Sequence, residues 1–275
     1  MKNVRIHIAV MVGALAVVAV IMLSPARSSS GQAPRPNVAA SFVAAAERNA
    51  TLKNELTWTF GGKQQRGWYL YESLIGKTLN THHDSTTSDF AAALAGWQKK
   101  MRLSADGVLD ENSLMRMVSQ WQSNRLKNRT YATPDQLLEG APSDFYDPGR
   151  AAELRQVERN TYAAYKEMVA AARADRELNL SPKYLKIVSA FRSREYQDEL
   201  RQKSPNSGPA GLAVNSPHFT GRALDLYVGG DPVDTKDSNR AIQVNTPAYR
   251  WLVLNAERFG FRPYFYEPWH WEYVK

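Results

Sequence analysis

Two histidines and an aspartate have the types and the spacing to bind a metal ion. His218 lies seven residues before Asp225, with Gly221 between them, and His270 lies close to the C-terminal residue. Catalytic zinc sites commonly use three such ligands and leave the fourth position open to water. The sequence therefore predicts one zinc ion bound by His218, Asp225 and His270.

A simpler interpretation exists for each residue taken alone. Asp225 lies in the apolar run "ALDLYV", where a buried carboxylate is costly unless a cation or hydrogen-bond donors meet it. Such an aspartate usually pairs with an arginine or with backbone amides. A single buried histidine is likewise more often hydrogen bonded than metal bound. The three residues together favour the metal site.

A second carboxylate, Glu267, lies three residues before His270. A carboxylate beside the water that zinc activates can accept a proton from it, since the metal lowers the pKa of that water toward about 7. Residues three apart in a regular strand point to opposite faces, so we expect Pro268 to distort the backbone here. The spacing predicts Glu267 as the general base.

The elements that carry these residues indicate an α+β fold over residues 150–275. Apolar residues from Leu154 to Ala172 recur at steps of three and four, which predicts a long amphipathic helix. The short β-rich runs "YLKIVSA" and "ALDLYV" follow, separated by a polar segment from Lys203 to Val214. Helix, strand, loop, strand, helix and terminal strand predict a small antiparallel sheet flanked by helices.

The preceding residues predict a small helical module at 51–126. Apolar residues at helical spacing indicate two helices, and Asp106 and Gly107 form a turn between them, with Asp110 placed to cap the second helix. The apolar positions are Phe90, Leu94, Trp97 and Met101 in the first helix and Leu114, Met117, Val118 and Trp121 in the second. Residues 127–149, which contain several prolines, are predicted to be a linker.

The first 27 residues predict export. Lys2 and Arg5 precede sixteen consecutive apolar residues from Ile8 to Leu23, a pattern typical of a signal peptide or an uncleaved membrane anchor. We expect the protein in the periplasm or cell envelope, in contact with a membrane only through this segment. Residues 28–50 are predicted to be a linker with a short helix from Val38 to Asn49.

Composition excludes several classes of protein. The chain has no cysteine, so disulfides, thiolate nucleophiles and cysteine-bound metals are excluded. The net charge of +8 comes from 35 Lys and Arg against 27 Asp and Glu, without the dense basic tracts typical of a nucleic-acid-binding arm. We expect no nucleic-acid partner, and a mild positive charge suits an anionic polymer such as a cell-wall glycan.

Three segments resemble, in order, the motifs of a known enzyme family. "SAFRS", "SPHFTGRALDL" and "YEPWHWEYV" are similar to those of the VanY-type D-alanyl-D-alanine carboxypeptidases. These belong to a zinc peptidase family that includes VanX and is related to lysostaphin-type and hedgehog-type domains. "WLVLNAERFGF" resembles the helix before the family's last strand, so the resemblance runs from about residue 150 to the end.

The resemblance implies a role for each matching residue. It implies zinc on the two histidines and Asp225, and Glu267 as the general base. It also implies that Arg192 is a cation for the transition state or the substrate, and that Ser216 contacts the substrate. Trp269 is expected to line the site. Either tryptophan could instead belong to the core, an interpretation that we favour for Trp271.

The segment from Phe90 to Gln122 resembles peptidoglycan-binding modules. Their signature is a helix ending in an aromatic residue and glutamine, an Asp-Gly turn and a second helix, and this chain has Asp110 where that family usually has glycine. The resemblance implies that the helical module binds cell-wall glycan.

Together the resemblances imply zinc-dependent hydrolysis of the D-Ala-D-Ala bond of peptidoglycan stem peptides, in cell-wall remodelling. Two alternatives stay open: a peptidoglycan endopeptidase with the same zinc site, and a non-catalytic wall-binding protein in which zinc is structural. Glu267 argues against the second alternative, because a structural zinc site has no use for a base.

Overall fold

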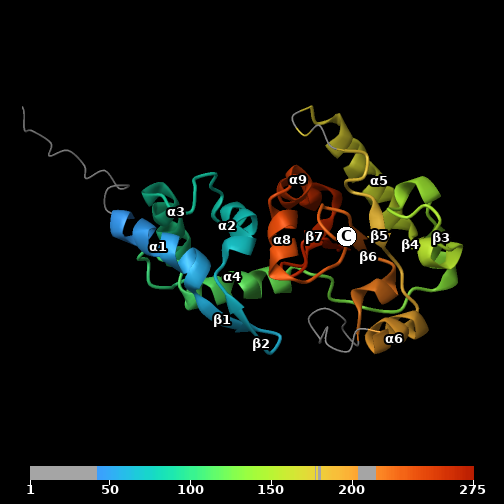
Figure 1. Ribbon diagram of the computed structural model, residues 1–275, viewed down its shortest axis with the longest axis horizontal. Coiled ribbons are helices and arrows are strands. Elements are labelled where there is room, and N and C mark those ends of the chain that lie inside the picture. The colour runs from blue at the N-terminus through green and yellow to red at the C-terminus, as the bar shows by residue number, and fades with distance from the viewer. Residues whose placement is uncertain (1–41, 177, 179–180, 204–214) are drawn as a thin grey trace, which may run out of the picture. The chain divides into compact units, whose positions relative to one another are not determined.

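The computed structural model describes residues 42–176, 178, 181–203 and 215–275 (Figure 1). The described residues belong to one compact unit. The segment predicted as a signal peptide or anchor, residues 1–27, lies outside the described residues. Within the described part of the chain, no helix is both long enough and apolar enough to cross a membrane.

The N-terminal part of the described chain combines helices with one β-hairpin. Its elements are α1 (Val43–Glu55), β1 (Thr57–Phe60), β2 (Lys63–Arg66), η2 (Tyr69–Tyr71), α2 (Glu72–Leu79), α3 (Ser88–Lys100) and α4 (Glu111–Ser123). The predicted pair of helices corresponds to α3 and α4. The Asp110 carboxylate accepts a hydrogen bond from the Ser113 N–H at 2.8 Å, so it caps α4 as predicted.

The first helix differs from its predicted range. It was expected to end at Asn49, but α1 continues to Glu55. The Asn49 side chain is buried within it, donates to the Gly107 carbonyl at 2.9 Å and accepts from the Leu109 N–H at 2.8 Å. This polar residue therefore marks a tertiary contact of the helix with the loop before α4 rather than the end of the helix.

The predicted linker at residues 127–149 contains short regular elements. They are η3 (Pro134–Gln136), β3 (Leu137–Glu139) and η4 (Pro142–Asp144). Strand β3 pairs antiparallel with β4 (Gln156–Glu158), which follows η5 (Ala152–Arg155). This segment is therefore hydrogen bonded to the chain that follows it.

The amphipathic helix begins later than its apolar spacing predicts. Helix α5 spans Arg159–Ala174, whereas Leu154 and Val157 belong to η5 and β4. The Glu158 carboxylate accepts from the N–H groups of Asn160 and Thr161, at 3.1 and 2.8 Å, and so fixes the start of the helix. Val157 is buried from a strand instead of from the helix face.

A four-stranded antiparallel sheet forms the centre of the C-terminal part, which confirms the predicted α+β class. Its strands, in the spatial order β5-β6-β8-β7, are β5 (Ile187–Ser189), β6 (Ala223–Leu226), β8 (His270–Tyr273) and β7 (Phe261–Pro263). The accompanying helices are α6 (Arg194–Lys203), η6 (Pro217–Thr220), α8 (Asp237–Val244), α9 (Pro247–Asn255) and η7 (Ala256–Phe259).

The N-terminal helices and the C-terminal sheet share a hydrophobic core. The rings of Tyr71 and Trp121 lie 5.4 and 5.8 Å from the ring of Phe265, between centroids. The Arg240 side chain is only 2% exposed and donates both to the Tyr71 hydroxyl at 3.4 Å and to the Tyr266 carbonyl at 3.1 Å. Removing the helical module would therefore expose apolar surface of the C-terminal part.

Candidate metal centre

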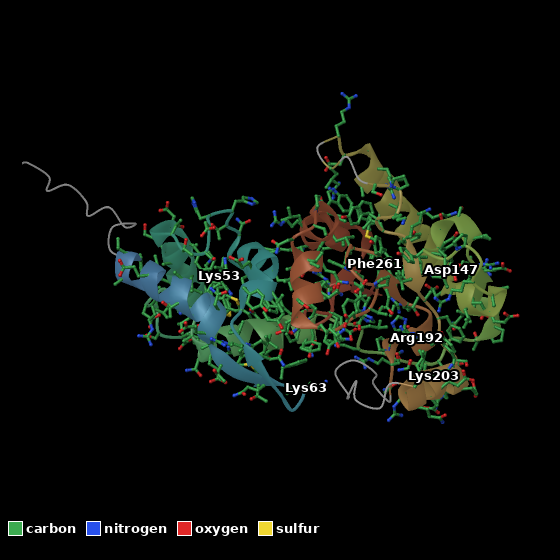
Figure 2. The ribbon with its side chains drawn as sticks, in the orientation of Figure 1. Lys53, Lys63, Asp147, Arg192, Lys203 and Phe261 are labelled. Carbon is green, nitrogen blue, oxygen red and sulfur yellow. The ribbon has the colours of Figure 1, made fainter. Side chains whose placement is uncertain are left out.

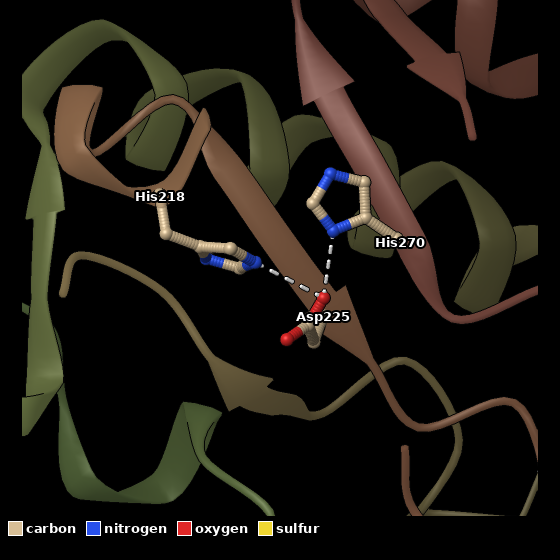
Figure 3. Close-up of side chains that lie close together, drawn as sticks. All are labelled: His218, Asp225 and His270. Atoms are coloured by element: carbon tan, nitrogen blue, oxygen red, sulfur yellow. Dashed lines mark hydrogen bonds and ion pairs between the residues drawn. The ribbon is translucent and has the colours of Figure 1, made fainter. Parts of the chain in front are cut away.

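His218, Asp225 and His270 lie together in the interior. Each is at most 3% exposed, and one potential ligand atom from each lies within 4.8 Å of the others. Figure 3 shows both imidazole rings directed at the Asp225 carboxylate. The structure thus brings together the three residues that the sequence predicts as metal ligands.

A short helix and a glycine bend place His218. The residue lies on η6, where the Ser216 hydroxyl accepts a hydrogen bond from the His218 N–H at 3.3 Å. Gly221 ends η6 with a φ of +66°, and a Cβ atom there would lie 2.9 Å from the Glu158 backbone nitrogen. Only glycine fits that turn without strain, and the chain then enters β6.

Strand pairing places the other two residues. Asp225 on β6 is directly opposite His270 on β8 in the antiparallel register. The His270 Nδ1 atom lies 2.9 Å from Asp225 Oδ1, and the His218 Nε2 atom lies 3.3 Å from the same oxygen. Directly opposed residues have their Cβ atoms about 5 Å apart, so the pairing itself brings the side chains into contact.

A hydrogen bond determines which ring nitrogen of His218 is free to bind a metal ion. His218 Nδ1 lies 2.6 Å from the Ala190 carbonyl oxygen, which can only accept, so the imidazole proton is on Nδ1. In a neutral His218, Nε2 has no proton and faces Asp225 Oδ1, which also has none. Both atoms are acceptors, and a cation between them would interact favourably with each.

The pKa values of these groups follow from burial and from neighbouring charge. Burial, aided by the Arg192 charge, lowers the pKa of His218 to about 4. Burial alone would lower the pKa of His270 too, but hydrogen bonds to Asp225 and Glu272 raise it to about 9. Burial opposes ionisation of Asp225, yet His218 and Arg192 hold its pKa well below the usual range. In the metal-free protein, Asp225 is thus an anion and His270 carries the balancing proton.

The donor set fits zinc. Two imidazole nitrogens and one carboxylate oxygen are typical zinc ligands, and a site with three protein ligands leaves a position open. Zinc bonds of about 2.0–2.1 Å in a tetrahedron separate neighbouring ligands by about 3.3 Å. Asp225 Oδ1 lies 3.3 Å from His218 Nε2 and 2.9 Å from His270 Nδ1, and both separations are close to this value.

Glu267 lies in a tight turn before β8 rather than in the strand. The Glu267 N–H donates to the Tyr264 carbonyl at 3.1 Å, and the His270 N–H donates to the Glu267 carbonyl at 2.9 Å. The turn brings Glu267 Oε2 to 4.0 Å from His270 Nδ1. It therefore removes the conflict that a regular strand would create between residues three apart.

Burial raises the pKa of Glu267 to about 8 in the metal-free protein; the charge of His270 opposes this shift, whereas that of Asp225 adds to it. Carboxyl groups with pKa values raised toward neutrality are common at catalytic sites, where they exchange protons. The group is 7% exposed. Its position and its environment both suit proton transfer at the metal centre.

Arg192 lies between β5 and α6 and is labelled in Figure 2. Its Nε donates to the Ser189 hydroxyl at 2.9 Å and its Nη1 to the Gln197 side-chain oxygen at 3.3 Å. Its Nη2 forms an ion pair with Asp225 Oδ2. Asp225 therefore pairs with an arginine, as buried aspartates usually do, and in addition contacts two histidines.

The remaining predicted site residues are largely buried. Ser216 is 3% exposed and caps η6. Trp269 is 3% exposed and belongs to the hydrophobic core, so its contact with substrate, like that of Ser216, stays a prediction. Trp271 is 1% exposed and packs edge-on against Tyr249, a core position as expected.

Sequence reasoning missed Glu272. Its Oε1 atom lies 3.2 Å from His270 Nε2, on the side of the ring away from Asp225. The signal was available, because residues two apart in a strand share a face. Its partner Arg125 gave no such signal, since 147 positions separate the two residues.

A comparison with known protein families gives one match, in the C-terminal part. Residues 154–275 match the profile of the family VanY, described as D-alanyl-D-alanine carboxypeptidase. Among curated proteins, none matches the chain.

Two solved structures resemble the chain. The LdcB LD-carboxypeptidase, whose structure concerns peptidoglycan recognition, is 24% identical over 54% of this chain and 71% of its own, with a TM-score of 0.39. VanYB in complex with D-alanine-D-alanine is 24% identical over 56% of this chain and 87% of its own, with a TM-score of 0.35.

Proposed function

Because residues 154–275 match the VanY family of D-alanyl-D-alanine carboxypeptidases, we propose that the protein hydrolyses the D-Ala-D-Ala bond of peptidoglycan stem peptides with one zinc ion. One observation carries the proposal. Within the matched residues, His218, Asp225 and His270 form a buried set of zinc-type donors, and Glu267 lies 4.0 Å from that set. A structural zinc site needs no proton acceptor, so it would not explain the buried Glu267 carboxyl group beside these residues.

The chemistry divides between the metal and the chain. A zinc ion held by the two histidines and Asp225 would polarise the scissile carbonyl and acidify the attacking water. Glu267 would accept the water proton at Oε2 and deliver it to the leaving amine. Its pKa of about 8 in the metal-free protein supports this role, because such a group both gains and loses protons near neutral pH.

Arg192 would stabilise the negative charge that develops on the carbonyl oxygen. Ser189 and Gln197 hold its guanidinium, and it lies against Asp225, so its charge is fixed beside the metal centre. A charge fixed before reaction needs no reorganisation in the transition state, which is the condition under which such groups are effective. Ser216 and Trp269 are further proposed substrate contacts.

The direct test compares two peptides. A stem pentapeptide ending in D-Ala-D-Ala should release free D-Ala, detected by mass, and its C-terminal amide should be a much poorer substrate. Cleavage between interior residues, with the terminal D-Ala still attached, would instead identify an endopeptidase. Failure to cleave any defined muropeptide, with zinc bound, would favour the non-catalytic alternative.

We also propose that the helical module binds cell-wall glycan. A cavity of about 400 Å³ lies between the loop after α3 and the first turns of α4. Its polar lining includes Asn112, Arg116 and Ser119, which suit the hydroxyl and carboxyl groups of a glycan.

This second proposal is best tested with substitutions in the full chain, because the module shares its core with the sheet. Arg116→Ala and Asn112→Ala should weaken sedimentation with intact sacculi and leave hydrolysis of a short soluble peptide unchanged. Arg48→Ala removes an equally exposed arginine from α1 and serves as the matched control. Equal sedimentation of all three variants with the wild-type chain would contradict glycan binding at this cavity.

We propose, finally, that residues 1–27 direct export to the periplasm or cell envelope. Cell fractionation of the full chain and of a chain lacking these residues tests this. The shortened protein should stay in the cytoplasm, and the length of the exported protein shows whether the segment is cleaved or kept as an anchor.

A further inference from the structure

Glu272 contacts Nε2 of the His270 ring, whereas Asp225 contacts Nδ1 of the same ring. It lies two residues after His270 on β8, so both side chains project from the same face of the strand. Its carboxylate is fully buried, and Oε1 lies 3.2 Å from His270 Nε2. A carboxylate accepts hydrogen bonds, so this contact keeps a proton on Nε2 and leaves Nδ1 to face Asp225.

The carboxylate of Glu272 is itself fixed by groups from a distant part of the chain. Arg125 donates to Oε1 through Nε at 3.1 Å and through Nη2, and the Leu126 N–H donates to Oε2 at 2.8 Å. Burying a carboxylate without such partners would be strongly destabilising. The segment that directly follows α4 therefore makes it possible for Glu272 to lie behind His270.

Arg125 is held in place by further contacts. Its guanidinium lies over the Tyr264 ring, 3.9 Å from the ring centroid, and its Nη1 donates to the Gln122 side chain at 3.2 Å. The Tyr264 N–H in turn donates to the His270 carbonyl at 3.0 Å. Arg125 thus contacts Glu272, which is next to the His270 ring, and Tyr264, which is hydrogen bonded to the His270 backbone.

We propose that Arg125 and Glu272 form a positioning pair that fixes His270 Nδ1 as a metal ligand, so that a residue outside the matched family range completes the metal centre. This inference rests on the proposed zinc site. Partners behind a metal-bound histidine set its ring orientation, and their loss typically lowers metal affinity about 10- to 100-fold. The pair would thereby connect the helical module to the metal centre.

A pair that only joined two parts of the chain would behave differently. Such a salt bridge contributes to folding, and its loss would leave the zinc affinity of the folded protein unchanged. Arg155 provides the matched comparison: like Arg125 its side chain is 12% exposed, and it pairs with a glutamate, Glu139. No described contact of the Arg155 side chain involves a proposed metal ligand.

The experiment measures the zinc dissociation constant of the full chain by competition with a chromophoric chelator. Glu272→Gln should raise it about 10- to 100-fold, and Arg125→Ala should raise it in the same direction. Arg125→Lys keeps the charge but not the two-nitrogen contact and should fall between Arg125→Ala and the wild type. Arg155→Ala should match the wild type.

Two outcomes separate this inference from the proposed function. If the wild-type chain binds no zinc, the proposed metal centre fails, and the positioning pair fails with it. If the wild type binds one zinc and both Glu272→Gln and Arg125→Ala keep its affinity, the pair is only structural and the inference alone is overturned.

A second measurement covers the case in which Glu272→Gln does not fold. Long-range proton–nitrogen NMR on the zinc-loaded wild-type chain should show that His270 has a proton on Nε2 and none on Nδ1, the proposed ligand atom. The reverse assignment would overturn the inference whatever the variants do. Arg125→Lys, the mildest change, should keep the Nε2 proton but speed its exchange with water.

Discussion

His270 Nδ1 lies 2.9 Å from Asp225 Oδ1, and the two residues are direct partners across β6 and β8. The second oxygen of the same carboxylate pairs with Arg192. One side chain therefore meets both histidines on one side and the guanidinium on the other. Changes at Asp225 should consequently affect metal binding and the position of the Arg192 guanidinium together.

Loss of any of the three proposed ligands should abolish stable zinc binding. His218→Ala, His270→Ala and Asp225→Ala each leave two protein ligands, too few for a tightly held catalytic zinc. Metal analysis after dialysis should fall from one zinc per wild-type chain to a small fraction in each variant. His83→Ala, at an exposed histidine, should keep its zinc. Full zinc content after loss of both His218 and His270 would place the metal elsewhere.

Glu267→Gln should bind zinc normally but turn over slowly. The amide keeps the size of the side chain and cannot accept a proton, so kcat should fall by about two to four orders of magnitude. Zinc content and the melting temperature should stay close to those of the wild-type chain. Glu153→Gln, at an exposed glutamate, is the control for the chemical change. Near-normal turnover of Glu267→Gln would show that another group is the base.

Arg192→Ala should mainly lower kcat. If the guanidinium stabilises the developing oxyanion, its loss should reduce kcat about 100- to 1,000-fold and change KM only a few-fold. A rise in KM alone would assign Arg192 to the substrate carboxylate, to which its planar fork is well suited.

The contact of Arg192 with Asp225 adds a second measurement to this prediction. We expect Arg192→Ala to retain zinc, because both histidines and Asp225 remain in place. A large loss of zinc affinity would mean that Arg192 acts chiefly by orienting Asp225. Arg192→Lys should recover part of the kcat, since it restores a positive charge without the full set of hydrogen bonds.

Alkaline pH should weaken the contact between the helical module and the sheet through Tyr71. Burial raises the pKa of Tyr71 from 10.0 to about 12. Between these values the unfolded chain has lost the proton that the folded chain keeps, so stability falls as the pH rises. Two pH units correspond to about 2.7 kcal/mol in full.

Urea unfolding at a pH of about 9 and about 11.5 isolates this contribution. Tyr71→Phe should lose about 2 kcal/mol less unfolding free energy across that interval than the wild-type chain does. Buried tyrosines distant from Tyr71 lower the stability of both proteins alike and cancel in the comparison, whereas Tyr249 and Tyr266 interact electrostatically with Tyr71. An equal loss in both would show that Tyr71 ionises as readily in the folded chain as in the unfolded one.

Local patterns in the sequence were sufficient for several elements of the C-terminal part, but not for α6, α8 or β7. Alternation and short β-rich runs indicated β5 and β6, and apolar spacing indicated α5, although its start was placed too early. Residue spacing cannot distinguish a buried strand residue such as Val157 from a helix face, since both require an apolar side chain. The capping contacts of Glu158 decide the boundary.

By itself, the sequence determined which residue types could bind zinc and which carboxylate could act as a base. Those inferences need only chemical identity and short-range spacing, as between His218 and Asp225. Strand pairing decided that His270 lies opposite Asp225, and the turn at Tyr264 decided that Glu267 reaches the same site. Tertiary packing alone brought Arg125 to Glu272 across 147 residues, because a buried charge finds its partner in space and leaves no periodic trace along the chain.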